Sequence, residues 1–219
     1  MKTAIMSLGK PVRRIAVVGT GAIGASWATL YLARGFDVIA TDPAPEAEAN
    51  LRRFIDTAWS TVAMLGLSPK ASPEHLWFTT DMRQALAEAD FVQENGPEQS
   101  ALKIKLFAEM DRATPPDSII ASSSSGLTMS IMQSACTHPE RCVIGHPFCP
   151  PHIIPLVEVV GGLKTSPDAV RQAMSFYASL RDDAQRQAGL AWAVPPRRKM
   201  RSRMASSGAT CSSTPRDCF

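Results

Sequence analysis

A glycine-rich turn near the start of the chain has the residue types and spacing needed to bind the pyrophosphate of a dinucleotide. In the pattern G-x-G-x-x-G, the first glycine permits a tight turn and the second lets the backbone approach the phosphates. The third lets a helix pack closely on the preceding strand. Free N–H groups at the start of that helix would then bind the anion. The residues that we expect to contact the dinucleotide here are Gly19, Gly21, Ala22, Ile23 and Gly24.

Asp42 supplies the second part of the expected dinucleotide site. It follows a predicted strand over residues 36–41 and lies 18 residues after Gly24, where a carboxylate can accept hydrogen bonds from both ribose hydroxyls. The next residues are Pro-Ala-Pro, with no cation to bind a 2′-phosphate. The pattern therefore predicts NAD rather than NADP as the cofactor.

Three further side chains, Ser125, His146 and Glu158, could carry a redox reaction on a hydroxyl group. Each lies on or just after a predicted strand, and reacting groups of an open α/β sheet gather at strand ends. A substrate that loses a hydride to NAD also loses its O–H proton, which a neutral imidazole with a pKa near ~6.5 can accept. A carboxylate would orient that imidazole, and a serine could hold the substrate oxygen. The spacing alone leaves a purely structural histidine open.

A second group of residues superficially resembles a set of zinc ligands. Its spacing, C-x-H-x3-C-x3-H, matches no structural zinc pattern, so we predict no metal site. The four residues are Cys136, His138, Cys142 and His146.

The elements that must position these residues alternate between strand and helix along the chain. This alternation predicts an α/β fold, a Rossmann-type doubly wound and mostly parallel sheet. We expect one domain over 12–181 and an irregular basic tail over 182–219, which has no helical or strand period. The predicted strands are 14–18, 36–41, 76–79, 90–94, 118–121, 142–146 and 156–160, and the predicted helices are 25–33, 45–65, 82–89, 98–111 and 166–180.

Composition excludes several classes of protein. The net charge of +3 is too small to indicate a nucleic-acid partner, and its basic excess lies in residues 182–219, which hold seven Arg or Lys and three Asp. No segment reaches the roughly 18 apolar residues of a membrane span, and residues 1–10 lack a signal-peptide core. Five cysteines without a framework spacing suit a reducing compartment, so we expect a cytoplasmic protein.

Five segments stand in the order and spacing of the L-3-hydroxyacyl-CoA dehydrogenase family, which the chain resembles over residues 12–181. The resemblance implies NAD-dependent oxidation of a 3-hydroxyl on a small-molecule substrate. The segments are 17–24, 94–98, 121–127, 145–151 and 156–160.

The resemblance also implies roles for individual residues. The family's catalytic histidine falls on His146, the glutamate paired with it on Glu158, and its serine near substrate and nicotinamide on Ser125. The glutamate and lysine that contact NAD after the fourth strand fall on Glu98 and Lys103.

Within the family, residues 91–98 and the four-serine run are most similar to the branch that oxidises the 3-hydroxyl of carnitine to 3-dehydrocarnitine. Acyl-CoA enzymes carry basic residues along the helix after the ribose aspartate, whereas residues 54–67 contain no Lys or Arg. Because a polyanion needs cations, this favours the carnitine branch. Arg52 and Arg53 keep a 3-hydroxyacyl-CoA substrate open as the alternative.

Two departures from the family pattern stand out. Cys149 occupies a position that is usually asparagine, and the resemblance ends near residue 181. In relatives a helical domain follows, which supplies an active-site asparagine, much of the substrate pocket and the homodimer interface. We therefore expect a truncated chain, from a shifted frame or a shortened gene, that binds NAD but oxidises carnitine weakly or not at all. A catalytically silent NAD-binding module, without the family's dimer, is the competing hypothesis.

Overall fold

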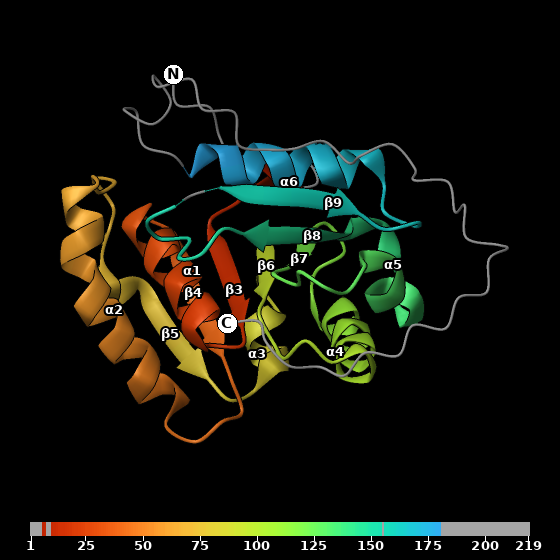
Figure 1. The fold of residues 1–219 in the computed structure, drawn as a ribbon, viewed down its shortest axis with the longest axis horizontal. Coiled ribbons are helices and arrows are strands. Elements are labelled where there is room, and N and C mark those ends of the chain that lie inside the picture. Colours follow the sequence, from red (N-terminus) through yellow and green to blue (C-terminus); the bar gives the residue numbers. More distant parts are fainter. Residues whose placement is uncertain (1–5, 8–9, 155, 181–219) are drawn as a thin grey trace, which may run out of the picture.

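The computed structural model describes residues 6–7, 10–154 and 156–180. Its centre is a seven-stranded sheet in the order β5-β4-β3-β6-β7-β8-β9 (Figure 1). Adjacent strands are parallel except β9, which runs antiparallel to β8. The strands are β3 (Arg14–Val18), β4 (Asp37–Thr41), β5 (Leu76–Thr79), β6 (Phe91–Glu94), β7 (Ile119–Ser122), β8 (Cys142–Pro147) and β9 (Val157–Gly161). Two short strands, β1 (Met6–Ser7) and β2 (Lys10–Pro11), pair separately.

Helices cover both faces of the sheet. Side chains alternate along each strand, so Ile15 and Val17 of β3 pack with α1, α2 and α6, whereas Ala16 and Val18 pack with α3, α4 and α5. In Figure 1, α6 lies along β8 and β9. The helices are α1 (Ala22–Ala33), α2 (Ala47–Met64), α3 (Met82–Leu86), α4 (Ser100–Ala113), α5 (Met129–Met132) and α6 (Pro167–Ser179), and 3-10 turns η1, η2 and η3 cover Pro73–His75, Gln133–Ala135 and Pro139–Arg141.

The order of the strands creates a switch point at the carboxyl edge of the sheet, where open α/β sheets form a crevice. From β3 the chain moves outward to β4 and β5, then returns to β6 on the other side of β3. The carboxyl ends of β3 and β6 therefore meet at the switch point, where the Asn95 N–H donates to the Val18 carbonyl at 2.7 Å. Ligands of open α/β sheets bind at this point.

The predicted doubly wound, mostly parallel sheet is confirmed, and every predicted strand is present within two residues of its predicted bounds. The predicted helix over 82–89 is shorter, because the chain turns after Leu86 to enter β6. Helix α5 and the β1–β2 pair were not predicted, since such short elements show no period. The predicted tail, 182–219, lies outside the described residues. No helix of the described part is both long and apolar enough to cross a membrane.

Candidate functional site

The glycine turn, residues 19–21 between β3 and α1, is shaped by close contacts. Gly19 has a φ of +84°, and a Cβ there would lie 3.0 Å from the Asn95 carbonyl carbon. A Cβ on Gly24 would lie 1.9 Å from the Gly19 backbone oxygen, so the helix and the turn can lie this close only because residue 24 is glycine. A Cβ on Gly21 would meet nothing within 4 Å. Side chains are therefore excluded at Gly19 and Gly24, whereas the space beside Gly21 is open.

The first turn of α1 is free to bind an anion. Gly21 is the N-cap, no side chain caps the helix, and no acidic residue lies in its first turn. The N–H groups of Ala22 and Ile23 begin the helix and have no intrahelical acceptor. The exposed Gly21 beside these donors leaves the space that a pyrophosphate needs, so the turn fits a dinucleotide.

Asp42 follows β4 and is held by the backbone on both sides. Its Oδ2 accepts from the Thr20 N–H at 2.8 Å and the Thr20 hydroxyl at 3.2 Å, and its Oδ1 accepts from the Ala44 N–H at 2.9 Å. The carboxylate is half-buried. Because a carboxylate has about four acceptor positions, it can still accept hydrogen bonds from a ribose.

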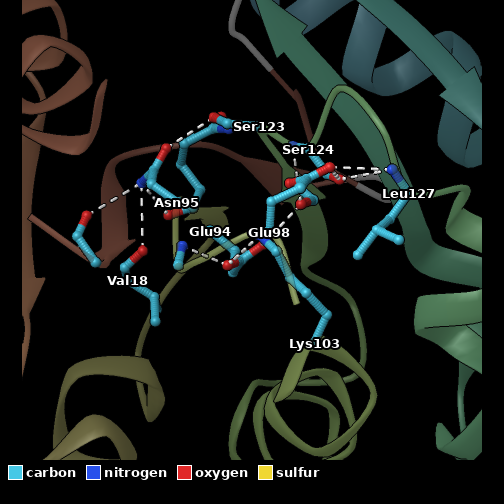
Figure 2. A network of polar contacts seen from close by, with 12 residues as sticks. Val18, Glu94, Asn95, Glu98, Lys103, Ser123, Ser124 and Leu127 are labelled. Carbon is cyan, nitrogen blue, oxygen red and sulfur yellow. Dashed lines mark hydrogen bonds and ion pairs between the residues drawn. The ribbon is translucent and has the colours of Figure 1, made fainter. Parts of the chain in front are cut away.

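Two loops meet at this edge of the sheet, and Figure 2 shows the polar contacts that join them. The Asn95 turn, residues 95–99, connects β6 to α4, and the serine loop, residues 123–128, connects β7 to α5. The Asn95 amide donates to the carbonyls of Val18 and Gly19, at 3.3 and 3.4 Å, and accepts from the Ser123 hydroxyl at 2.7 Å. Asn95 thus joins the glycine turn to the serine loop.

Glu98 fixes the serine loop with a single carboxylate oxygen. Its Oε1 accepts from the Ser124 hydroxyl at 2.5 Å and from the N–H groups of Gly126 and Leu127, at 2.7 and 3.0 Å. Burial alone would raise the pKa of the Glu98 carboxyl, but these three hydrogen bonds and the nearby Lys103 ammonium lower it below its ordinary value. Glu98 is therefore ionised at neutral pH. Ser125 lies at the tip of this loop and is exposed.

Lys103 is fully buried on α4. Its Nζ donates to both carboxylate oxygens of Glu94, each at 2.8 Å. Lys103 therefore lies beneath the two loops rather than on the surface of the crevice.

His146 and Glu158 face each other across two antiparallel strands. The register of β8 and β9 pairs these residues directly, and His146 Nδ1 lies 3.5 Å from Glu158 Oε2. Both side chains are partly exposed. Ser125 follows β7, and His146 lies near the end of the adjacent parallel strand β8, so all three residues predicted to carry the reaction lie at the carboxyl edge of the sheet.

Sequence reasoning did not identify three residues around this edge: His152, Ser26 and Phe148. The Ser26 oxygen lies 2.7 Å from His152 Nδ1 and accepts from the His152 N–H at 3.2 Å, which ties the β8–β9 loop to α1. Burial lowers the pKa of His152. The Phe148 side chain is exposed, and its ring centroid lies 6.3 Å from that of His146. His152 and Phe148 lie in the loop after β8, outside any periodic element, so only the histidine-proline motif nearby could have directed attention to them.

The four residues of the rejected zinc pattern do not converge. His146 faces Glu158, His138 faces Glu140, and the thiols of Cys136 and Cys142 hydrogen-bond each other. Within the described residues no three His, Cys, Asp or Glu side chains form a group that could hold a metal ion.

With this geometry in place, comparison with known proteins identifies the class. The family model described as "3-hydroxyacyl-CoA dehydrogenase, NAD binding domain" matches residues 14–184, and the chain belongs to this family. The fold is accordingly that of an NAD-binding domain, with NAD as the cofactor.

Among curated relatives, the chain is similar to L-carnitine dehydrogenases. It is 53% identical over 167 residues to the enzyme of Streptomyces griseus, covering 76% of this chain and 50% of the relative. It is 46% identical over 175 residues to the enzyme of Pseudomonas aeruginosa, covering 80% and 54%. The chain therefore spans about half the length of the curated relatives that it matches.

Two solved structures are also similar. A 5-formyl-3-hydroxy-2-methylpyridine 4-carboxylic acid 5-dehydrogenase has a TM-score of 0.71 at 34% identity, covering 77% of this chain and 55% of that chain. The 3-hydroxybutyryl-CoA dehydrogenase of Escherichia coli has a TM-score of 0.71 at 29% identity, covering 77% and 36%.

Proposed function

We propose that this chain supplies the NAD site and the acid–base pair for oxidation of the 3-hydroxyl of L-carnitine to a ketone, giving 3-dehydrocarnitine. The observation that carries the chemistry is the pairing of His146 with Glu158 at the carboxyl edge of the sheet that also bears the glycine turn. The identity with L-carnitine dehydrogenases supports the choice of substrate.

In this proposal His146 is the general base. A carboxylate near Nδ1 stabilises the tautomer that carries its proton there, which leaves Nε2 free to accept the proton of the substrate hydroxyl. Glu158 then stabilises the imidazolium that forms. When bound, NAD supplies the hydride acceptor for the C–H bond that breaks at the same carbon.

The remaining residues orient the two reactants. We assign Ser125 to the substrate oxygen, since its exposed hydroxyl follows the strand next to His146. Glu98 holds the serine loop with Oε1, and its other oxygen, Oε2, is assigned to the nicotinamide ribose. The glycine turn holds the pyrophosphate, and Asp42 the adenine ribose.

Two features support carnitine over an acyl-CoA thioester. Phe148 presents an exposed aromatic face beside His146, which a quaternary ammonium can contact although it cannot donate a hydrogen bond. On α2, Arg52 pairs with Glu48 at 2.8 Å and Arg53 donates to Asn50 at 2.9 Å, so both guanidinium groups already have partners.

The proposal is tested with a chimera in which residues 14–180 of this chain replace the matching half of the Streptomyces griseus enzyme. We expect carnitine-dependent formation of NADH. The His146→Gln variant should lower kcat by about 10²- to 10⁴-fold at unchanged NAD affinity, with a smaller loss for Glu158→Gln, which keeps the base. A chimera that binds NAD, measured by calorimetry, but shows no carnitine oxidation would overturn the proposal.

A further inference from the structure

Gln93 is a fully buried amide on the central strand β6, and side chains from two helices reach it. It is 0% exposed, so its donors and its acceptor must be satisfied within the protein. Its Oε1 accepts from the hydroxyls of Tyr31 on α1 and Tyr177 on α6, at 3.0 and 2.7 Å. Its Nε2 donates to the hydroxyl oxygen of Ser123 at 3.0 Å. The amide therefore joins both helices to the first residue of the serine loop.

The two phenols that contact Gln93 are tightly packed donors. Burial raises the pKa of Tyr31 and of Tyr177, so each hydroxyl keeps its proton at neutral pH. A Cβ on Gly145 would lie 2.1 Å from the Tyr177 hydroxyl oxygen, so this ring fills the space that a side chain would take on β8. The Tyr31 ring stacks on Trp27 with the centroids 5.3 Å apart. Both phenols thus hold the oxygen end of the Gln93 amide.

Asn95 lies at the other end of the same chain of hydrogen bonds, against the glycine turn (Figure 2). Its Nδ2 lies 3.3 Å from the carbonyl oxygen of Val18, 3.4 Å from that of Gly19 and 3.1 Å from that of Gln93. Because carbonyl oxygens can only accept, this end of the side chain must be the NH₂ group. Asn95 Oδ1 therefore faces Ser123, and the Ser123 hydroxyl must donate to it, at 2.7 Å.

Ser123 lies between these two amides and has only one proton to give. Once that proton is donated to Asn95, the Ser123 oxygen can act only as an acceptor. Two N–H groups fill its acceptor positions, the Trp27 indole at 3.0 Å and the Gln93 amide at 3.0 Å. The side chain at position 93 must therefore be a donor toward Ser123. An ionised glutamate of the same shape would instead compete with Asn95 for the Ser123 proton.

We propose that Gln93 is a positioning residue for NAD binding: by donating to Ser123 it directs the Ser123 proton to Asn95, which then holds the glycine turn. Gln93 is fully buried and does not itself contact the cofactor. The proposal rests on NAD binding by the glycine turn and is independent of which hydroxy compound the protein oxidises. The alternative is an amide that only joins α1 and α6 to the sheet, with no effect on the cofactor.

The variant Gln93→Glu separates these two roles, because its carboxyl group can donate to Ser123 only while it is protonated. Burial raises the pKa of a carboxyl group, so we expect it to exchange its proton between about pH 5 and pH 9. The ionisable groups that contact position 93 in the described part of the chain are the phenols of Tyr31 and Tyr177, which stay protonated over this range.

Calorimetric NAD titration of the full chain from pH 5 to pH 9 supplies the measurement, as the ratio of the affinities of Gln93→Glu and the unmodified chain at each pH. At the acidic end the two affinities should agree within about threefold, and at the alkaline end the variant should bind at least about tenfold more weakly. The melting temperature of the variant, followed over the same range, locates the titration of the new carboxyl group. An affinity ratio that stays constant through that titration would overturn the proposal.

The matched control is the same substitution at another buried glutamine, Gln133→Glu. Gln133 is 1% exposed, and its Nε2 donates to the Pro139 carbonyl at 2.6 Å, within the segment that packs against α4. This variant should also make the melting temperature depend on pH, because it too buries a carboxyl group. Its NAD affinity should match that of the unmodified chain at every pH. An equal loss of NAD affinity in both variants would assign the effect to buried charge in general and overturn the proposal.

A second test uses no new charge and decides the question where Gln93→Glu fails to fold. Ser123→Ala removes the donor to Asn95 and should weaken NAD binding by about 3- to 10-fold, whereas Asn95→Ala removes the contact with the glycine turn itself. Because both changes act through Asn95, the double variant should bind NAD no more weakly than Asn95→Ala alone. Unchanged affinity in Ser123→Ala, or losses that multiply in the double variant, would overturn the proposal. Failure of the cofactor assignment is distinct, since it would appear as absent NAD binding in the unmodified chain.

Discussion

The carboxylate of Asp42 is fixed before any cofactor is present, because Thr20 and Ala44 donate to its two oxygens. A 2′-phosphate would meet this fixed negative charge, so NAD should bind more tightly than NADP. In Asp42→Ala, NAD affinity should fall by about tenfold or more, as expected for loss of hydrogen bonds to a charged group. The difference between the affinities for NAD and NADP should become smaller. Calorimetry with both dinucleotides measures this. Tighter binding of NADP by the unmodified chain would contradict the assignment.

A second prediction for a single residue concerns Phe148 and the affinity for the substrate. Its exposed ring lies beside His146, where it can contact a trimethylammonium group. Such a contact contributes roughly 0.5–2 kcal/mol, so Phe148→Leu in the chimera should raise the KM for carnitine by about 2- to 30-fold. Neither kcat nor NAD affinity should change much.

Trp77→Leu is the control for Phe148, because Trp77 is half exposed on β5, at the opposite edge of the sheet. It should leave the KM for carnitine unchanged. An unaltered KM in Phe148→Leu would remove the ring from substrate recognition.

At the scale of the element, two glycines near the β3–α1 turn have different roles. Gly24 allows close packing of the helix, and Gly21 leaves room for the cofactor. An alanine at position 24 would place its Cβ 1.9 Å from the Gly19 oxygen, whereas one at position 21 would meet nothing within 4 Å. We expect Gly24→Ala to lower the melting temperature. Gly21→Ala should leave the melting temperature nearly unchanged and still weaken NAD binding, because the new methyl group occupies the approach of the pyrophosphate.

Thermal unfolding and NAD titration of the two glycine variants test this division. The assignment of Gly21 to the pyrophosphate would be wrong if Gly21→Ala bound NAD as tightly as the unmodified chain.

The β8–β9 loop is anchored to α1 by a pair of hydrogen bonds between Ser26 and His152, both of them buried. Ser26→Ala leaves the His152 ring nitrogen without its partner, which should cost about 1–3 kcal/mol of stability. Limited proteolysis should then cut the loop faster. The control is Thr29→Val, which removes another buried hydroxyl of α1, one that donates to the Ala25 carbonyl of the same helix at 2.8 Å.

Burial of His152 should also make the stability of the chain depend on pH. Because burial holds the folded pKa of His152 below its unfolded value of about 6.5, the stability that the neutral ring contributes is complete above that value and is lost as the pH falls through the folded pKa. The stability difference between the unmodified chain and His152→Gln, whose side chain does not titrate, should therefore shrink below about pH 6.5. A constant difference would contradict this role of the buried ring.

The strands and the long helices could be predicted because their apolar residues recur with a clear period. The alternation of strands with helices also predicted a mostly parallel sheet, but it did not identify β9 as the strand that runs antiparallel to its neighbour. The contact between His146 and Glu158 depends on that direction: β9 turns back against β8, and the register sets the two residues opposite each other. Family resemblance anticipated the pair, whereas the Glu94–Lys103 contact left no sequence signal, since its partners lie on a strand end and a helix.

At the scale of the whole molecule, the sheet and its helices are tied together by buried polar groups as well as by apolar packing. Gln93 on the central strand β6 accepts from the hydroxyls of Tyr31 and Tyr177, at 3.0 and 2.7 Å, which links α1 and α6 across one face. On the other face, Arg141 and Asp111 link the start of β8 to the end of α4 at 2.9 Å. These contacts therefore connect the helices and strands on both sides of the crevice.

The ion pair of Asp111 with Arg141 should make the stability of the folded chain depend on pH in acid. Burial opposes its charge, but N–H groups of Thr137 and His138 and the guanidinium of Arg141 together lower the pKa of the Asp111 carboxyl. A depressed carboxyl pKa contributes stability that is complete above the unfolded value, about 3.9, and is lost as the pH falls through the folded pKa. Asp111→Asn should cost about 3–5 kcal/mol at neutral pH, because it leaves Arg141 buried without its counter-charge.

Melting temperatures from pH 7 downward measure this effect as a difference between the unmodified chain and Asp111→Asn, so that other titrating carboxylates cancel. The difference should be constant above about pH 4 and should narrow below it, as Asp111 takes up its proton in the unmodified chain. Asp168→Asn breaks an exposed ion pair with Arg171 on α6 and should cost no more than about 1 kcal/mol. If the melting temperatures of the unmodified chain and Asp111→Asn differed by the same amount at every pH, that result would contradict the role of the Asp111–Arg141 ion pair in joining β8 to α4.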